Sequence, residues 1–192
     1  MSFHRVGLLL FAAACAVAAS GCLGQPSYRV EPVYTRPELK SCQRMAVTGL
    51  SGEMEQILMG TYARTFRDQA IVFVERERVK DLFAEKDLLT GDIDSDTREQ
   101  IKKLGAVQGI IFGYYKETRQ DDQKVETLRL RILDVESGDI VGSAIVHAKS
   151  KEGANAAGMT QRAAEALRNH LLGISRKPQR PGMRNTRRYG MQ

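Results

Sequence analysis

The most specific chemical signature in this chain is the run Ala-Ser-Gly-Cys at residues 19–22, which closes a short apolar segment. The segment covers residues 6–19 and follows the basic Arg5. A basic start, an apolar middle and small residues before a cleavage point are typical of a bacterial secretory signal. At 14 residues the segment is shorter than the roughly 20 that cross a bilayer, which disfavours an uncleaved membrane helix. A soluble export signal cut near the same place is the other alternative, and the cysteine argues against it.

This run resembles the lipobox of bacterial lipoproteins, with Ala19 where leucine is preferred. The resemblance implies cleavage between Gly21 and Cys22, diacylation of the Cys22 thiol and acylation of its new amino terminus. Each buried methylene contributes about 0.8 kcal/mol, so three acyl chains would hold the chain on a membrane essentially permanently. Leu23 follows where aspartate would signal inner-membrane retention. The implied location is the inner leaflet of the outer membrane, facing the periplasm of a Gram-negative bacterium.

The net charge of +6 belongs to the ends of the chain. Arg5 lies in the signal, and residues 174–192 form a tail in which prolines and glycine disfavour a helix. The rest of the chain is close to neutral, and an exported protein does not normally meet nucleic acid. The tail is either solvated or a basic arm that contacts anionic lipid headgroups, lipopolysaccharide phosphates or an acidic protein surface. Its cations are Arg176, Lys177, Arg180, Arg184, Arg187 and Arg188.

Three cysteines are present, and they have different expected fates. Cys15 leaves with the signal and Cys22 carries lipid, so Cys42 is the one thiol left in an oxidising compartment, without a partner for an internal disulfide. We expect a partly buried, inert thiol at the start of a strand. An intermolecular disulfide is the sharper alternative.

Candidate metal ligands are weak. The acids at 92, 94 and 96 have the spacing of a calcium loop, but Thr97 replaces its glycine and Lys103 its bidentate glutamate. A solvated loop in which Asp96 caps a helix, with Glu99 as its capping-box partner, is favoured. The histidines at 4, 147 and 170 have no cysteine or carboxylate at ligand spacing, so no metal or other cofactor is expected.

No catalytic constellation is visible either. An enzyme would require a cleft that brings together scattered polar groups such as Asp134, Glu136 and His147. His147 is expected to be a surface or edge residue of a strand. Gly109 and Gly113 lie within a predicted strand, where glycine permits close approach of another element and does not form a phosphate-binding loop. The chain is therefore expected not to be an enzyme.

Hydrophobic periodicity predicts one domain. The strands are expected at 44–50, 70–74 (buried on both faces), 107–117, 125–135 and 140–148, and the helices at 53–68, from 75 through 83, 96–104 and 155–172. Glycines at 105 and 173 end the last two helices. The clearest strand, 125–135, alternates apolar and arginine side chains, which is typical of antiparallel pairing with one face in water. Ser137 and Gly138 predict a tight hairpin after it.

The expected fold class is α/β (α+β): a mixed sheet of about five strands, ending in an antiparallel meander and covered by about four helices. The expected organisation is a lipoprotein signal peptide at 1–21, a lipid-anchored tether at 22–42, the domain at 43–173 and the basic tail at 174–192. The tether contains three prolines and no periodicity. In extended form it would hold the domain some tens of ångströms from the membrane.

Part of the domain resembles the CsgG/HfaB/FlgO/LpoB-like family of bacterial envelope lipoproteins, over about residues 43–172. The matching segments are Phe-Val-Glu-Arg at 73–76, the apolar and acidic positions Val79, Leu82, Phe83 and Glu85, and two further runs. These runs are Leu-Gly-Ala-Val-Gln-Gly-Ile-Ile-Phe-Gly at 104–113 and Arg-Ile-Leu-Asp-Val-Glu-Ser-Gly-Asp-Ile-Val at 131–141. All of these motifs are structural. The resemblance implies a lipid-anchored α/β domain.

One departure from that family bears on function. Its secretion pore is built from long inserted hairpins, whereas the connection at 118–124 is short and polar here. Outside the core strands, nothing alternates over the 9–11 residues of a membrane strand. We therefore expect a non-enzymatic adaptor in envelope biogenesis or secretion, with a periplasmic or outer-membrane protein partner. The alternative is one subunit of a ring-forming secretion channel, which would be a homo-oligomer.

Overall fold

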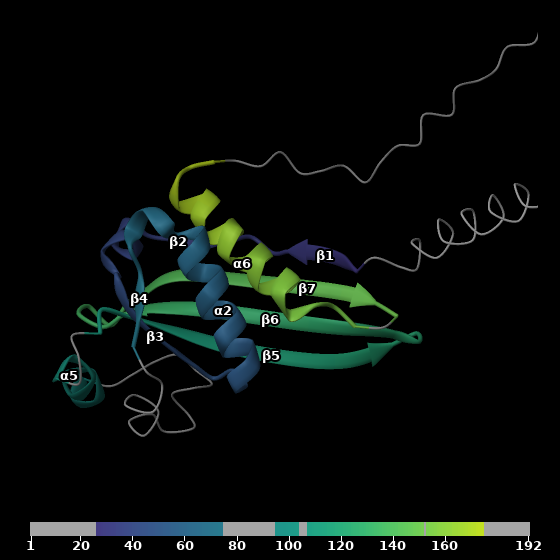
Figure 1. Ribbon diagram of the computed structural model, residues 1–192, viewed down its shortest axis with the longest axis horizontal. Helices are drawn as coiled ribbons and strands as arrows, with labels where there is room; N and C mark the ends of the chain where they lie inside the picture. The colour runs from purple at the N-terminus through teal and green to yellow at the C-terminus, as the bar shows by residue number, and fades with distance from the viewer. Residues whose placement is uncertain (1–25, 75–94, 104–106, 152, 175–192) are drawn as a thin grey trace, which may run out of the picture.

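The computed structural model describes residues 26–74, 95–103, 107–151 and 153–174 (Figure 1). Within them lies a mixed sheet of seven strands. The strands are β1 (Ser27–Val30), β2 (Tyr34–Thr35), β3 (Arg44–Thr48), β4 (Val72–Phe73), β5 (Gly109–Gln120), β6 (Gln123–Asp134) and β7 (Ile140–Ser150). The α-helices are α2 (Gly52–Thr65), α5 (Ser95–Lys103) and α6 (Ala156–Leu171), and 3-10 turns cover Pro37–Ser41 and Arg67–Gln69.

The sheet follows the order β1-β7-β6-β5-β3-β4, with β2 also paired to β7. The strands β5, β6 and β7 form the predicted antiparallel meander, whereas β3 pairs in parallel with β4 and β5. Both α2 and α6 lie across the same face of the sheet (Figure 1). The mixed α+β architecture is therefore as the sequence predicted, with two more strands than expected.

The two helices on this face are held by apolar stripes. In α2, Leu58 and Tyr62 are buried, and Tyr62 stacks on Phe66 with ring centroids 4.4 Å apart. In α6, the side chain of Asn155 accepts a hydrogen bond from the Ala157 amide at 2.9 Å, which caps the helix. The helix ends before Gly173, which has a φ of 68° as expected of a C-terminal cap.

The expected tether proves to be largely part of the domain. From Ser27, β1 pairs with β7, and β2 continues the pairing at Ser143 and Gly142. The turn at Pro37–Ser41 then places Leu39 in the core, 1% exposed. The prediction missed these strands because they are short, half polar and without alternation. Their pairing depends on backbone hydrogen bonds to β7, which leave no pattern in the side chains.

Other boundaries also differ. The strand expected at 70–74 reduces to β4, and Val72 is 54% exposed because β4 is the edge strand beside β3. The expectation that it is buried on both faces is wrong. Helix α5 begins at Ser95, so Asp96 lies in its first turn and is not the cap. The helix expected from residue 75 and the stop at Gly105 lie outside the described residues.

The connection at 118–124 is a tight hairpin. Strand β5 continues to Gln120 and β6 starts at Gln123, so two residues make the turn. Asp121 and Asp122 adopt φ values of 51° and 57°. Two successive residues with positive φ characterise the type I′ turn, whose twist matches that of the strands, and aspartate tolerates this conformation.

The glycines of β5 permit close packing, as predicted. A Cβ atom added to Gly113 would lie 2.3 Å from Leu50 Cγ, and one added to Gly49 would lie 2.3 Å from the Gly113 carbonyl oxygen. Gly49 has a φ of 82°, so both residues at this crossing are required to be small. The segment between β3 and α2 is thereby pressed against β5.

We predict that Gly113→Ala lowers the free energy of unfolding by about 1–3 kcal/mol, because the new methyl group overpacks against Leu50. The matched control is Gly60→Ala in α2, where a Cβ atom meets nothing within 4 Å. There alanine removes the backbone entropy of glycine and is expected to stabilise by about 0.5–1 kcal/mol. Urea unfolding of both variants provides the measurement, and equal effects would refute the close approach.

Candidate binding surface

The sheet face opposite α2 and α6 is covered at one end by helix α5. There Ile101 of α5 is fully buried in a small cluster with Ala46, Ile110, Phe112 and Leu133. Beyond this end, the outward side chains of β5, β6, β7 and β1 are mostly polar and are half-buried or exposed. We call this region the open face. Among the described residues, no helix lies over it.

Strand register determines which side chains share the open face, because cross-strand partners point to the same side. Ser27, Lys149, Val125 and Thr118 form the row nearest the start of β1. The next row is Arg29, His147, Thr127 and Lys116, and the third contains Ile145, Arg129 and Tyr114. Four strands that are distant in sequence thus build one surface.

The charge of the open face is one-sided. It carries the exposed cations Arg29, Lys116, Arg129 and Lys149. No ion pair to these four side chains occurs within the described part of the chain. The acid at its margin, Glu31, contacts His147 Nε2 through Oε1 at 2.8 Å. The face can therefore attract anions although the domain as a whole is close to neutral.

His147 is held on both sides of its ring. Its Nδ1 lies 3.0 Å from Thr127 Oγ1 on the neighbouring strand, and its Nε2 contacts Glu31. A ring with both nitrogens engaged is fixed in orientation and has no lone pair directed at a substrate. The expectation that His147 is a surface or edge residue of a strand agrees with this arrangement.

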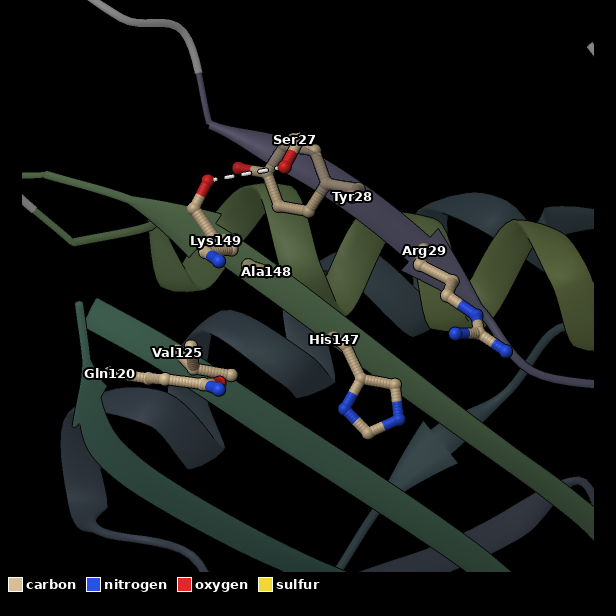
Figure 2. A pocket seen from close by; sticks show the side chains of 8 residues that line it. All are labelled: Ser27, Tyr28, Arg29, Gln120, Val125, His147, Ala148 and Lys149. Carbon is tan, nitrogen blue, oxygen red and sulfur yellow. Dashed lines mark hydrogen bonds between the residues drawn. The ribbon is translucent and has the colours of Figure 1, made fainter. Parts of the chain in front are cut away.

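A shallow pocket opens at the first two rows of the open face (Figure 2). It has a volume of about 430 Å³ and is lined by Ser27, Tyr28, Arg29, Gln120, Val125, His147, Ala148 and Lys149. Ser27 Oγ donates a hydrogen bond to the Lys149 carbonyl oxygen at 3.3 Å, which ties the start of β1 to β7. The cationic side chains of Arg29 and Lys149 in this pocket are suited to binding an anionic group.

Asp134, Glu136 and His147, which an active-site cleft would have to bring together, do not lie together in the structure. Asp134 ends β6, where its carboxylate accepts hydrogen bonds from the Ser137 hydroxyl at 2.7 Å and the Ser137 amide at 3.1 Å. Glu136 is exposed in the same turn. His147 pairs with Thr127, seven residues along β6 from Asp134. At about 3.3 Å per residue this separates them by about 23 Å, so the three residues form no common site.

Cys42 is buried and lies two residues before β3, as the favoured interpretation predicted. Its side chain is 1% exposed and lies over Gly109, where an added Cβ would be 3.0 Å from Cys42 Cβ. Burial raises the pKa of the thiol to about 12, and the charge of Asp134 adds to this effect. Burial and the raised pKa both disfavour the intermolecular disulfide that was the alternative.

Glu126 is a structural residue that the sequence analysis missed. It is 4% exposed and accepts hydrogen bonds from the Tyr115 hydroxyl at 2.5 Å and from the Ala154 amide. Desolvation, followed by the hydrogen bond and charge of Glu126, raises the pKa of Tyr115. The alternation of β6 could have indicated this burial, because Glu126 is two residues from Leu128 and therefore lies on the same, apolar side of the strand. Its carboxylate connects the sheet to the segment that precedes α6.

Other predicted residues have structural roles or lie beyond the described part. His170 Nδ1 contacts Thr35 Oγ1 at 2.7 Å and so ties α6 to β2. No cluster of potential metal ligands is found within the described residues. Over the same ranges, no helix is both long and apolar enough to cross a membrane. Gly21, Cys22, the acids at 92 and 94 and the cations of the tail lie outside these ranges.

Comparisons with known proteins give a likeness of fold alone. No protein-family model matches the chain, and no curated protein matches it. Among solved structures, a PelC dodecamer from Paraburkholderia phytofirmans is similar at 12% identity and a TM-score of 0.45, over 80% of this chain and 100% of that one. A PDZ domain protein from Parabacteroides distasonis is similar at 6% identity and a TM-score of 0.46, over 81% of this chain and 38% of that one. A lipoprotein from Neisseria meningitidis is similar at 12% identity and a TM-score of 0.37, over 68% of this chain and 98% of that one.

We predict that Cys42 resists alkylation in the folded protein at pH 8. With a pKa of about 12, only about one thiol in ten thousand is ionised at that pH, and burial also excludes the reagent. The measurement uses the full chain with Cys15→Ser and Cys22→Ser, so that one thiol remains. Addition of denaturant should give one modified thiol per chain. Rapid modification without denaturant would contradict the buried position.

Proposed function

We propose that this chain is an outer-membrane lipoprotein, held by acylated Cys22, whose domain is a non-enzymatic periplasmic adaptor. Its partner is a periplasmic or outer-membrane protein of envelope assembly, secretion or peptidoglycan synthesis. The observation that carries this proposal is the lipobox-like run at 19–22, which stands directly before a folded domain. Only four residues, 23–26, separate Cys22 from the first strand at Ser27.

Binding is favoured over catalysis because the side chains that could act in catalysis are buried or already hydrogen-bonded within the fold. Both ring nitrogens of His147 have partners, the Cys42 thiol is buried, and the Asp134 carboxylate binds the turn after β6. These groups maintain the fold. The open face, by contrast, presents exposed charge on a paired sheet, which suits contact with another charged surface more than catalysis.

The anchor is tested by Cys22→Ser, because serine cannot accept the thioether-linked diacylglycerol of a lipoprotein. We expect the variant to lose palmitate labelling and to appear in the soluble periplasmic fraction instead of the outer-membrane fraction. Cys15→Ser is the matched control, since Cys15 lies within the apolar segment and should leave both properties unchanged. Retention of Cys22→Ser with the outer membrane, together with unchanged labelling, would refute the anchor.

The adaptor role is tested by crosslinking in intact cells, followed by affinity purification and sizing in detergent. A monomer or small oligomer that crosslinks reproducibly to one envelope protein is expected. Cys22→Ser should lose most of this crosslink, because the unanchored domain is diluted away from its partner. A uniform ring of many copies without another protein would instead favour the channel-subunit hypothesis and contradict the adaptor.

A further inference from the structure

The length of chain between the proposed anchor and the domain limits how far the domain can move from the membrane. Cys22 lies five residues before Ser27, and Ser27 is paired with Lys149 at the start of β1. An extended chain spans at most about 3.6 Å per residue, so Ser27 remains within about 18 Å of the acylated residue. The start of β1 therefore stays at the membrane surface, in contrast to the long tether expected from the sequence.

The cations of the open face lie close to this point. Lys149 is in the first row, with Ser27, and Arg29 and Lys116 are in the second. Arg129 is in the third row, four residues along the strands from the first. At about 3.3 Å per residue this is about 13 Å, which is less than the reach of the anchor segment. All four cations can approach the same membrane surface.

We propose that the open face of the sheet docks on the anionic phospholipid headgroups of the leaflet that carries the anchor. The proposal rests on the proposed function, because acylated Cys22 brings the face to the membrane. Lipid headgroups are favoured as occupants by the short anchor segment and by charge complementarity. A basic surface is attracted to an anionic membrane, and the attraction acts only within about a Debye length, so it requires the face to be held close to the headgroups.

The pocket gives the first two rows a concave shape that suits a headgroup. Arg29 and Lys149 line it from neighbouring strands, and His147 lies in the same row as Arg29 (Figure 2). Glu31 lies at the margin of the open face, where its Oε1 contacts His147 Nε2 at 2.8 Å, and its single charge is outnumbered by the four cations of the face. A phosphate in this pocket would meet two cationic side chains whose backbones are fixed by the sheet.

The neighbouring surfaces indicate which side faces the lipid. The β5–β6 tip is mixed in charge: it carries Asp121 and Asp122, and Lys124 there pairs with Glu117 at 3.0 Å. The far end of the same sheet face is apolar and packed under Ile101 of α5. The open face between them is the one-sided region. The domain is therefore oriented with this face toward the headgroups, which leaves α2 and α6 directed toward the periplasm.

The test measures partition of the full chain, carrying Cys22→Ser, between buffer and lipid vesicles. One vesicle preparation contains one-third phosphatidylglycerol and the other contains phosphatidylcholine alone. The ratio of the two partition coefficients isolates the anionic contribution, because the apolar segment at 6–19 acts in both. The face variant is Arg29→Gln/Lys116→Gln/Lys149→Gln. The matched control, Lys40→Gln/Arg64→Gln/Arg67→Gln, removes the same charge from the Pro37–Ser41 turn, the end of α2 and the Arg67–Gln69 turn.

We expect the face variant to lower this ratio at least tenfold and the control to lower it less than twofold. Added salt should reduce the ratio of the parent chain, because exposed charges are screened. A face variant that behaves like the control would overturn the proposal, as would a ratio that is independent of salt. A face variant with an unchanged ratio that loses the crosslinked partner would assign the face to an acidic protein instead.

Circular dichroism verifies that the face variant folds. If it does not, Lys116→Gln/Lys149→Gln leaves β1 intact and should still lower the ratio at least fivefold. The outcome is separate from that of the proposed function, because no variant in this test can be acylated at residue 22. Failure of palmitate labelling would refute the anchor alone, whereas failure of the vesicle assay would refute docking by the open face alone.

Discussion

The structure depends on the backbone pairing along both sides of β7. On one side β7 pairs with β6 over most of its length, and on the other it pairs with β1 and then β2. Its inward side chains Val141, Ala144, Val146 and Ala148 are buried under the helices. This strand thus connects the apolar core to the N-terminal segment. Because β1 is paired, the domain begins at Ser27, and the position of the domain relative to the proposed anchor follows from that pairing.

The same pairing gives the two sheet faces different functions. Alternation directs Leu128, Leu130 and Ile132 of β6 toward α2 and α6, where they are fully buried. Between them, Arg129 points to the opposite face and is exposed. Packing on one face leaves the other face to solvent, and the charged side chains Arg29, Lys116, Arg129 and Lys149 in the rows near β1 are all basic. In this way a domain of nearly neutral net charge has its positive charge concentrated on one face.

Strong periodicity made the central part of the fold predictable. The alternation of β6, the Ser137–Gly138 turn and the stripe of α6 each arise from neighbouring residues, and each was recognised in the sequence. Strands β1 and β2 were missed because an edge strand needs only backbone partners, and β4 was overestimated because an edge position exposes Val72. Apolar composition does not distinguish an edge strand from a central one.

The candidate surface was less accessible to prediction. Its cations come from four strands, and Arg29 was placed in a free tether, where it had no neighbours. Net charge gave no indication, because Glu126 and other acids elsewhere in the domain offset these side chains. Cross-strand register is the information that brings Arg29, His147 and Lys116 into one row. The sequence contained the residues of this surface, but their adjacency depends on pairing between distant segments.

The outer edge formed by β1 and β2 has a further consequence for a molecule crowded on a two-dimensional surface. Pro32 interrupts this edge between the two short strands, and proline has no amide hydrogen to donate. Arg29 and Glu31 add charge along the same border. Short strands, charge and proline are the features by which sheet proteins prevent another chain from continuing the ladder. Copies held by the proposed anchor would therefore reach high local density without polymerising through this side of the sheet.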